Sequence, residues 1–406
     1  MNKNDSVVIV GGGLAGASAA FALREHGMQG RVVLVGEEQV APYERPPMSK
    51  GYLRGEDPFE KTLVRPEAEY GSQNIELLLG RRAVTLDPVG RTLNLDDGTD
   101  LTYDSLLLAT GSAPRKLGFG RPGLAGVHYL RTVEDADALR DAAVSATSIV
   151  VIGGGWIGSE VAASLKQLGH DVTMISATER PLEAVLGPEI GQVYADLHAE
   201  HGVQIVHGLV SDIDGDEHVT AVRLEDGRTF ATDLVVVGIG ATPRIKLATR
   251  GGLETTEGGI AVDEYLRSSV PNIYAAGDVA AAWHPRFGRH IRVEHWDNAV
   301  RQGKTAAANI AGVTEAYART PYFYSDQFDL GMEYRGFAPK WGRIVVRGDL
   351  VTREFIAFWL ADGRVVAAMN ANLWESGAEL KKLVESEQRI DPDRLADPAV
   401  PLNMAA

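Results

Sequence analysis

The sequence predicts an α/β fold built from two similar doubly wound domains and a smaller α+β domain at the C-terminal end. Three observations predict it. A glycine-rich turn between a short apolar strand and a helix occurs twice, with first glycines Gly11 and Gly153 lying 142 residues apart. Each turn is followed by an apolar run that ends in glycine, at 106–111 and at 234–240. Beyond Thr320, aromatic and β-branched residues dominate, as in antiparallel strands.

Composition bounds the possibilities further. The chain has 406 residues, 45% hydrophobic and 23% charged, which is enough for two or three domains with sizeable cores. Its 40 Lys and Arg against 55 Asp and Glu give a net charge of −15 without a basic block, which disfavours nucleic-acid binding. The N-terminal apolar run is broken by glycines from Gly11, so it predicts neither a signal peptide nor a membrane span. We therefore expect a soluble, cytoplasmic protein.

Cysteine is absent from the sequence. Its absence excludes disulfide frameworks, thiolate metal sites, cysteine nucleophiles and redox dithiols. Histidines 284, 290 and 295 cluster in the chain, but their spacings of six and five residues do not match a zinc helix, and we expect no metal.

The first glycine turn carries the pattern of a Rossmann-like phosphate site. Val7–Val10 reads as a strand and 17–25 as a helix, with Gly11, Leu14, Ala15 and other small residues between them. Within Gly-x-Gly-x-x-Gly, Gly11 makes the turn, Gly13 admits a pyrophosphate and Gly16 allows the helix to pack tightly on the strand. The next strand, 31–35, is followed by Glu37, an acid placed to accept hydrogen bonds from a ribose.

The second turn repeats this arrangement. A strand at 148–152 leads into Gly153, Gly155 and Gly158, a helix that runs to Leu168, and a strand at 171–175. Two phosphate-cradling turns so far apart imply two dinucleotides bound in two domains.

A late NIYAAGD segment at 272–278 completes a set of motifs. Together with GGGLAG, ATG and GGGWIG it resembles the two-dinucleotide flavoprotein reductases, which bind FAD at the first turn and NAD(P)H at the second. The segments PYERPPMSK (42–50), YLRT (129–132), RVEHWDNA (292–299) and YFYSDQF (322–328) resemble the ferredoxin reductases of bacterial oxygenase systems, the putidaredoxin reductase type. The resemblance covers nearly the whole chain.

The resemblance implies a glutathione-reductase-like domain order. It assigns 1–112 and 243–320 to an FAD-binding domain, 113–242 to an NAD(P)H-binding domain, and 321–406 to the C-terminal α+β domain. FAD is expected to bind tightly and non-covalently, with NADH or NADPH as co-substrate. The implied cofactor-binding residues are Gly11, Gly13, Leu14, Ala15, Gly16, Glu37, Arg45, Lys50, Ala83, Ala109, Thr110, Gly111, Arg131, Gly153, Gly155, Trp156, Ile157, Gly158, Ser176, Arg180, Gly240, Gly277, Asp278 and Trp296.

The resemblance also implies a catalytic pair, Lys50 and Glu160. A cation beside flavin N5 favours the reduced anionic ring, and the glutamate would hold the lysine and seat the nicotinamide. The alternative is that Glu160 is an ordinary first-turn helix acid favoured by the helix dipole.

Two tryptophans have alternative interpretations. Trp156 matches a position where an aromatic ring covers the flavin until nicotinamide displaces it, or it packs between two domains. Trp296 lies in the segment that lines the flavin's pyrimidine end in relatives, or it is an ordinary core aromatic.

Nucleotide preference is open. Ser176 stands where reductases that use NADH usually carry an acid that repels a 2′-phosphate. Glu179 could restore that repulsion, whereas Arg180 could pair with a phosphate. Because no arginine cluster stands there, NADH is favoured.

The absence of cysteine selects the chemistry within the family. Without a dithiol or peroxidatic thiol, the flavin must pass electrons on directly. The resemblance implies that they go, in one-electron steps, to a [2Fe–2S] ferredoxin that serves an oxygenase. A rubredoxin or Rieske-type ferredoxin is an alternative acceptor. An NADH:quinone or diaphorase-type flavoprotein and an apoptosis-inducing-factor-like, non-catalytic NADH sensor remain alternatives.

Docking on an acidic ferredoxin needs local positive charge on this acidic chain, and Arg65, Lys304 and Lys340 are the candidates. We expect a monomer or weak dimer. In the C-terminal domain, strands are predicted at 322–328, 343–346, 355–360 and 365–369, turns at Gly348-Asp349 and Asp362-Gly363, and a helix at 376–386.

Overall fold

The computed structural model describes residues 3–121 and 123–404 and divides the chain into two compact units. The first unit comprises Met1–Glu44, Phe59–Ala113 and Ala241–Arg319; the second comprises Arg45–Pro58, Pro114–Gly240 and Thr320–Ala406. The α/β fold predicted from the sequence is confirmed. The segment 45–58 belongs to the second unit rather than to the one that carries the first glycine turn, and the three-domain division stays a prediction.

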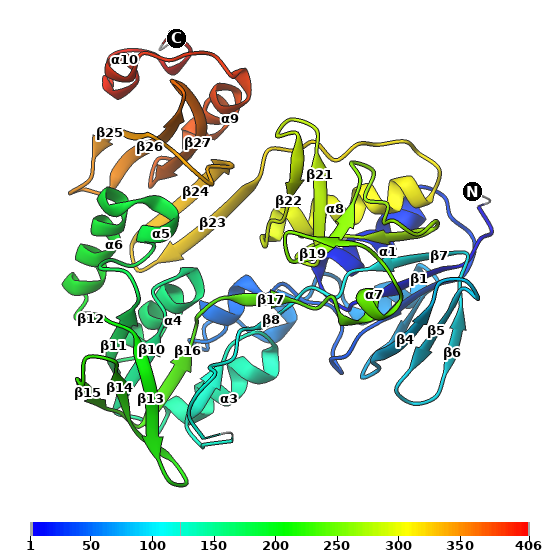
Figure 1. Cartoon of the computed structure of the whole chain (residues 1–406), viewed down its shortest axis with the longest axis horizontal. Helices are drawn as coiled ribbons and strands as arrows, with labels where there is room; N and C mark the ends of the chain where they lie inside the picture. Colours follow the sequence, from blue (N-terminus) through cyan, green and yellow to red (C-terminus); the bar gives the residue numbers. More distant parts are fainter. Residues whose placement is uncertain (1–2, 122, 405–406) are drawn as a thin grey trace. The chain divides into compact units, whose positions relative to one another are not determined.

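A five-stranded parallel sheet forms the centre of the first unit (Figure 1). Its order is β20-β7-β1-β2-β3. Apart from Ser105, the residues of β1, β2, β7 and β20 are all buried and apolar, as expected for a parallel sheet covered on both faces, whereas the edge strand β3 buries only Ile75. The strands are β1 (Val7–Val10), β2 (Val32–Val35), β3 (Ile75–Leu78), β7 (Ser105–Leu108) and β20 (Ile273–Ala275).

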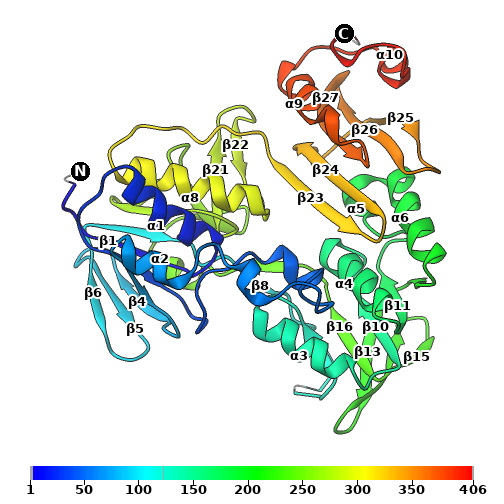
Figure 2. The same cartoon turned by 180° about the vertical axis from the view of Figure 1, so that it is seen from behind.

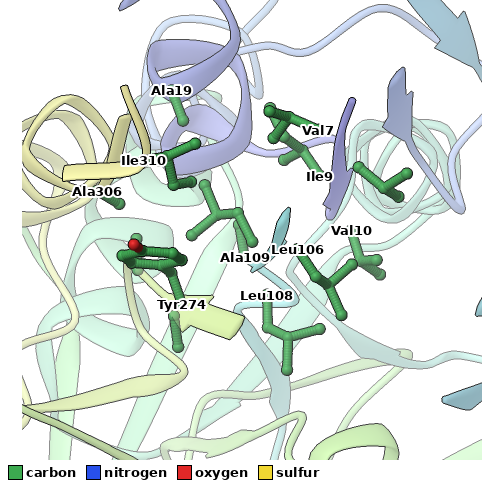
Figure 3. Packing of buried hydrophobic residues seen from close by; sticks show 14 of the residues in the cluster. Val7, Ile9, Val10, Ala19, Leu106, Leu108, Ala109, Tyr274, Ala306 and Ile310 are labelled. Atoms are coloured by element: carbon green, nitrogen blue, oxygen red, sulfur yellow. The ribbon is translucent and has the colours of Figure 1, made fainter. Parts of the chain in front are cut away.

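Two helices, α1 (Leu14–Glu25) and α8 (Trp296–Ile310), pack side by side in this unit. Their backbones approach closely because Gly303 lacks a side chain: a Cβ there would lie 2.3 Å from the carbonyl oxygen of Ala15. Figure 3 shows Ala19, Ala306 and Ile310 of these helices gathered with side chains of the sheet. Helix α1 begins at Leu14, three residues before the predicted start, so the glycine turn leads directly into it.

Smaller elements complete the first unit. They are α2 (Glu67–Ser72), α7 (Lys246–Arg250), the 3-10 turn η2 (Phe59–Thr62), a sheet of β4 (Ala83–Asp87), β5 (Thr92–Leu95) and β6 (Asp100–Thr102), and a sheet of β18 (Thr255–Thr256), β19 (Gly259–Val262), β21 (Ala280–His284) and β22 (Arg289–Ile291). Strands β8 (Ser112–Pro114) and β17 (Ala241–Pro243) pair where the chain passes from one unit to the other.

The second unit contains a parallel sheet with the same strand order as the first. Its order is β9-β16-β10-β11-β12, in which β10 has the central place that β1 has in the first sheet, and each glycine turn follows the central strand. This repetition confirms that the two halves are built alike. The strands are β9 (Val127–Tyr129), β10 (Ser148–Ile152), β11 (Asp171–Ser176), β12 (Gln204–His207) and β16 (Leu234–Val237).

Further elements of this unit surround that sheet. They are η1 (Pro46–Ser49), α3 (Val133–Ala143), α4 (Trp156–Gln167), α5 (Glu183–Leu186), α6 (Pro188–Glu200), and a small sheet of β13 (Val210–Gly215), β14 (Val219–Leu224) and β15 (Thr229–Ala231).

The C-terminal part of the unit is an antiparallel sheet with helices on both faces. Alternate residues of its strands face two cores: one shared with α5 and α6, the other shared with α9 and α10. Figure 2 shows α9 against this sheet. The strands are β23 (Tyr322–Gln327), β24 (Leu330–Gly336), β25 (Arg343–Asp349), β26 (Glu354–Ala361) and β27 (Arg364–Ala371); the helices are η3 (Trp374–Ser376), α9 (Gly377–Ser386), α10 (Pro392–Ala396) and η4 (Leu402–Met404).

Strand β24 was not predicted because charged side chains interrupt its apolar pattern. Glu333 and Arg335 are held by their own ion pair of 2.9 Å, and Glu333 also accepts a hydrogen bond of 2.7 Å from the hydroxyl of Tyr322. Asn370 accepts from Arg335 at 2.9 Å. These partners make the charges tolerable within the sheet.

One predicted turn is wrong. Gly348 and Asp349 pair with Phe355 and Glu354 and so extend β25, and the chain reverses at 350–353 instead. Gly348 is required for a different reason: its φ is +103°, and a Cβ would lie 2.5 Å from the carbonyl oxygen of Glu354. The turn at Asp362-Gly363 is confirmed, with positive φ at both residues.

Candidate functional site

The first glycine turn leaves room for a ligand at one position and none at the other two. Gly11 has a φ of +129°, and a Cβ there would lie 2.0 Å from the carbonyl oxygen of Ala109. A Cβ at Gly16 would lie 2.1 Å from the carbonyl oxygen of Gly11, whereas one at Gly13 would meet nothing within 4 Å. Gly13 is also the N-cap of α1, and no side chain caps this end. The helix N–H groups are therefore available to an anion such as a pyrophosphate.

The second turn has the same geometry. Gly153 has a φ of +117°, and its Cβ would lie 2.3 Å from the carbonyl oxygen of Gly238; a Cβ at Gly158 would lie 1.9 Å from that of Gly153. Gly155 faces open space and is the N-cap of α4, again without a side-chain cap. Ile157, in the first turn of α4, is 47% exposed. Both turns therefore fit a dinucleotide phosphate.

The strand ends beside the turns carry further predicted residues. Ala109 closes against Gly11, and the hydroxyl of Thr110 donates 2.9 Å to the carbonyl of Arg244. Gly111 has a φ of +63°. In the second unit, Gly240, with a φ of +106°, accepts a backbone hydrogen bond of 2.9 Å from Arg115.

Glu37, expected to bind a ribose, lies just beyond β2 and forms an ion pair with Arg244. Its side chain is 49% exposed, so a ribose hydroxyl could also reach it. Ala83, another predicted cofactor residue, is half-buried at the start of β4.

The start of α8 presents an unsatisfied donor. The indole N–H of Trp296 is buried and has no hydrogen-bond partner among the described residues. A buried donor without an acceptor is costly, and an acceptor on a ligand, such as a flavin carbonyl or nitrogen, would fit this position. The N–H of Gly277, with a φ of +80°, donates 2.8 Å to Gln302 and fixes the loop that carries Asp278.

His295 precedes Trp296 and is neutral at physiological pH. Burial lowers the pKa of His295 to about 4, and the nearby carboxylate of Asp278 opposes this shift without cancelling it. His284 hydrogen-bonds the carbonyl of Arg319 at 3.0 Å, and the ring of His290 packs edge-on against Trp283. Within residues 3–121 and 123–404, no group of three or more His, Asp or Glu side chains could hold a metal ion.

In the second unit, the turn η1 brings three predicted residues together. The guanidinium of Arg45 donates 2.5 Å to the carbonyl of Arg131, whose own N–H donates 3.0 Å to Asp135. Lys50 follows the turn, and its ammonium lies 2.7 Å from Oε1 of Glu160. The Lys50 and Glu160 side chains are 15% and 5% exposed.

Two serine hydroxyls also donate to Glu160. Ser49 donates 2.5 Å to Oε2 and Ser325 donates 2.7 Å to Oε1. With Lys50, the carboxylate thus has three donors, which matches an ionised group that can only accept. Glu160 is therefore part of a built ion-pair site, unlike a free first-turn helix acid.

Trp156 packs between helix α6 and strand β23 of the second unit. Its ring meets Tyr194 of α6 edge-on at 6.3 Å and Phe323 of β23 at 5.0 Å. These contacts favour the packing alternative for this residue; its contact with flavin stays a prediction.

The loop after β11 bears on nucleotide preference. Ser176 is buried, and its hydroxyl oxygen accepts 3.2 Å from the N–H of Thr178, so it closes its own turn. Arg180 is held by Glu179 at 3.0 Å, by Glu183 at 3.4 Å and by Gln192 at 2.7 Å. The arginine is thus neutralised by two carboxylates.

The three candidates for ferredoxin docking differ in their contacts. Arg65 is 3.6 Å from Glu69 and lies over the ring of Phe21. Lys304 and Lys340 are exposed and form no ion pair with a described residue.

Sequence reasoning missed several residues of these sites. Ser49 and Ser325 lie inside the family-like segments PYERPPMSK and YFYSDQF, and Ser49 directly precedes Lys50, so these segments carry the signal that could have found them. Arg244 and Gln302 lie in no motif, and only the folded chain brings them to Glu37 and Gly277.

Comparison with known proteins gives full-length matches. Residues 5–303 match the family of pyridine nucleotide-disulphide oxidoreductases, and residues 322–406 match the reductase C-terminal domain. Putidaredoxin reductase of Pseudomonas putida is 38% identical, covering 99% of this chain and 97% of its own. The ferredoxin–NAD(+) reductase component of the anthranilate 1,2-dioxygenase system of Burkholderia cepacia is 41% identical, covering 98% of each chain.

Solved structures agree. The covalent putidaredoxin reductase–putidaredoxin complex superposes with a TM-score of 0.94 at 37% identity, covering 99% of this chain and 98% of that chain. The ferredoxin reductase for the CYP199A2 system from Rhodopseudomonas palustris superposes with a TM-score of 0.95 at 35% identity, covering 99% and 100%. These matches confirm the resemblance drawn from the motifs. The chain belongs to the pyridine nucleotide-disulphide oxidoreductase family, in the branch whose members end in a reductase C-terminal domain.

Proposed function

We propose that this protein is an FAD-containing reductase that passes electrons from NADH to a [2Fe–2S] ferredoxin serving an oxygenase. The observation that carries the proposal is the combination of two phosphate-cradling turns with a sequence that contains no cysteine. Without a dithiol, electrons must leave the flavin directly, which suits a one-electron acceptor. The family binds FAD, and the named relatives are ferredoxin reductases. A cytoplasmic location and a monomeric or weakly dimeric state remain predictions.

The chain's own residues supply binding and electrostatics. When bound, FAD supplies the chemistry: it accepts two electrons from the nicotinamide and delivers them singly. The uncapped N-termini of α1 and α4 would hold the phosphates, and the Trp296 N–H would donate a hydrogen bond to an acceptor on the flavin ring. Lys50, held by Glu160, would place a positive charge beside the flavin ring, where negative charge develops on reduction. No general acid is required of the protein.

NADH is the proposed co-substrate. The two carboxylates around Arg180 offset its charge and would repel a 2′-phosphate. The Ser176 hydroxyl accepts a hydrogen bond from the Thr178 N–H within its own loop. The charge balance at the ribose end is therefore unfavourable to NADPH.

The proposed partner is an acidic iron–sulfur protein. Lys304 and Lys340 are the better docking candidates because Arg65 already pairs with Glu69. Charge reversal at either lysine should slow electron transfer to the ferredoxin and flatten its dependence on salt. A reversal that changes neither would remove that residue from the docking surface. A rubredoxin is the second candidate acceptor, because a rubredoxin–NAD(+) reductase of Pseudomonas putida is 37% identical over 91% of this chain.

The test is anaerobic stopped-flow mixing of the purified yellow protein with NADH and, separately, NADPH. We expect loss of the oxidised flavin band at about 10 per second or faster with NADH, a typical enzymatic rate. Reoxidation is then followed with putidaredoxin, a rubredoxin and a soluble quinone as probe acceptors. Preference for an iron–sulfur protein supports the proposal, and preference for the quinone favours a diaphorase. Reduction slower than about one per minute with both nucleotides would contradict it and favour a long-lived, NADH-sensing flavoprotein.

A further inference from the structure

One face of β23 contacts the second dinucleotide-binding half at three successive inward positions. Phe323 packs on Trp156, Ser325 donates to Glu160, and Gln327 accepts from His198 of α6. Strand geometry explains the spacing, because residues two apart share a face. Trp156 and Glu160 share a face of α4 because they are four residues apart. The C-terminal sheet therefore contacts the residues around the Lys50–Glu160 pair directly, through side chains of β23.

The hydrogen bonds along this face run in one direction. Nε2 of His198 lies 2.8 Å from Oε1 of Gln327, Nε2 of Gln327 lies 3.4 Å from Oγ of Ser325, and Oγ of Ser325 lies 2.7 Å from Glu160. Because Ser325 has one proton and donates it to the carboxylate, its oxygen accepts from the Gln327 amide. The Gln327 carbonyl then accepts from an N–H on His198.

Every member of this chain of hydrogen bonds is buried. Glu160 is 5% exposed, and Ser325, Gln327 and His198 are 1% or less. His198 stays neutral because burial lowers its pKa to about 4, and Nδ1 has no hydrogen-bond partner among the described residues. The imidazole ring is therefore a fixed donor. The dipoles of the His198 ring, the Gln327 amide and the Ser325 hydroxyl all point their positive ends toward the Glu160 carboxylate.

We propose that Ser325 is a positioning residue for the Lys50–Glu160 pair, and that Gln327 and His198 fix the orientation of its hydroxyl. Through this series of hydrogen bonds the C-terminal domain determines the position of the Lys50 ammonium. It thereby determines how strongly the reduced flavin is stabilised. The inference rests on the proposed function only in taking Lys50 to face the flavin. It goes beyond that function because it assigns the C-terminal domain a part in the flavin's redox properties.

The test compares two buried serines. Ser325→Ala removes the donor to Glu160, while Ser159→Ala is the matched control: Ser159 precedes Glu160 in α4, is fully buried, and its hydroxyl faces Met174 at 3.8 Å. In Ser325→Ala we expect the flavin midpoint potential to move to more negative values and the limiting rate of flavin reduction by NADH to fall about tenfold, with NADH affinity changed less than about twofold. Ser159→Ala should change neither quantity.

Two more variants separate positioning from folding. Ser325→Thr keeps a hydroxyl and should restore most of the potential and rate. Gln327→Met leaves Ser325 in place but removes the donor that orients its hydroxyl and the acceptor of the His198 N–H. It should therefore lower thermal stability, and it should slow flavin reduction less than Ser325→Ala does. If Ser325→Ala matches Ser159→Ala in both potential and rate, or if Ser325→Thr fails to restore them, the inference is wrong. The potential is measured by reductive titration without NADH, so this arm holds even if the proposed NADH reaction fails.

Discussion

The ammonium of Lys50 lies 2.7 Å from Oε1 of Glu160, and neither side chain exposes more than 15% of its surface. The residues are 110 positions apart in the sequence, and the serines at 49 and 325 complete the carboxylate's partners. A charge pair this well enclosed is costly to break, because removing one partner leaves the other charged and unpaired.

Lys50→Met tests the catalytic role of this pair. We expect the limiting rate of flavin reduction by NADH to fall at least about tenfold, equivalent to about 1.4 kcal/mol of transition-state stabilisation, because the fixed positive charge is lost. Stopped-flow absorbance at saturating NADH measures it. Lys382→Met, at an exposed position, provides the control. A reduction in rate of less than about threefold would remove Lys50 from the reaction.

Gly13→Ala and Gly155→Ala form a matched pair for the two turns. Both glycines have φ values that alanine adopts, −95° and −82°, and a Cβ at either meets nothing within 4 Å, so the fold should persist. The methyl group would stand where a phosphate approaches. We expect Gly13→Ala to lose FAD on gel filtration, and Gly155→Ala to keep FAD but bind NADH at least about tenfold more weakly. If Gly13→Ala retains FAD fully while unfolding no more readily, the first turn does not hold the phosphates.

Trp296→Phe tests whether the orphan indole N–H serves a ligand. The apoprotein should be as stable as the parent or slightly more stable, because a buried unsatisfied donor is removed. FAD affinity should fall about fivefold, or about 1 kcal/mol, the usual value of one hydrogen bond. Flavin fluorescence titration and thermal unfolding of the apoprotein give the two numbers, and Trp283→Phe, at a partly exposed position, is the control. Unchanged FAD affinity would contradict the assignment.

Neutralising both acids around Arg180 should relax nucleotide selection. In Glu179→Gln/Glu183→Gln the guanidinium loses both carboxylate partners and becomes able to pair with a 2′-phosphate. We expect kcat/KM for NADPH to rise about tenfold while that for NADH changes less than about threefold. Glu200→Gln on α6, whose carboxylate pairs with Arg353, is the matched control. No gain with NADPH would mean that another part of the site selects the nucleotide.

His198 makes stability depend on pH. Its pKa is about 4 in the folded protein and is lowered from 6.5, so the unfolded chain binds a proton that the folded chain does not. The contribution is complete above pH 6.5 and is lost as the pH falls from there toward 4. Between pH 7 and pH 5 the loss is about 2 kcal/mol.

The measurement is urea unfolding at the two pH values. His198→Gln keeps an N–H donor for Gln327 but cannot titrate, so its stability should fall about 2 kcal/mol less than the parent's over this interval. Equal losses in both proteins would show that His198 is not protonated on unfolding in this range.

Part of the site could be predicted because it is local. Strand, glycine turn and helix at Gly11 and at Gly153 are continuous stretches, and the steric need for glycine there is written in a few adjacent residues. The family's motifs added the expectation that Lys50 meets Glu160, which the fold brings about. No spacing rule connects positions 50 and 160 without that resemblance.

Other features depend on partners distant in the chain. Strand β24 carries Glu333 and Arg335, which look like surface charges until Tyr322 and Asn370 enclose them. Gly348 looks like a turn residue until the pairing of β25 with β26 places it in a strand.

The sequence by itself determined the α/β class, the repeated dinucleotide-binding halves and the chemistry that the absence of cysteine leaves open, because these follow from local sterics and residue type. Only the tertiary structure decided that β23 packs on α4 and that Ser325, Gln327 and His198 form a series of hydrogen bonds to Glu160. It also decided that two neighbouring carboxylates neutralise Arg180. These contacts join segments more than 100 residues apart or depend on which way a side chain turns. Packing chooses such pairings, since burial makes each unsatisfied polar group costly until a distant partner meets it.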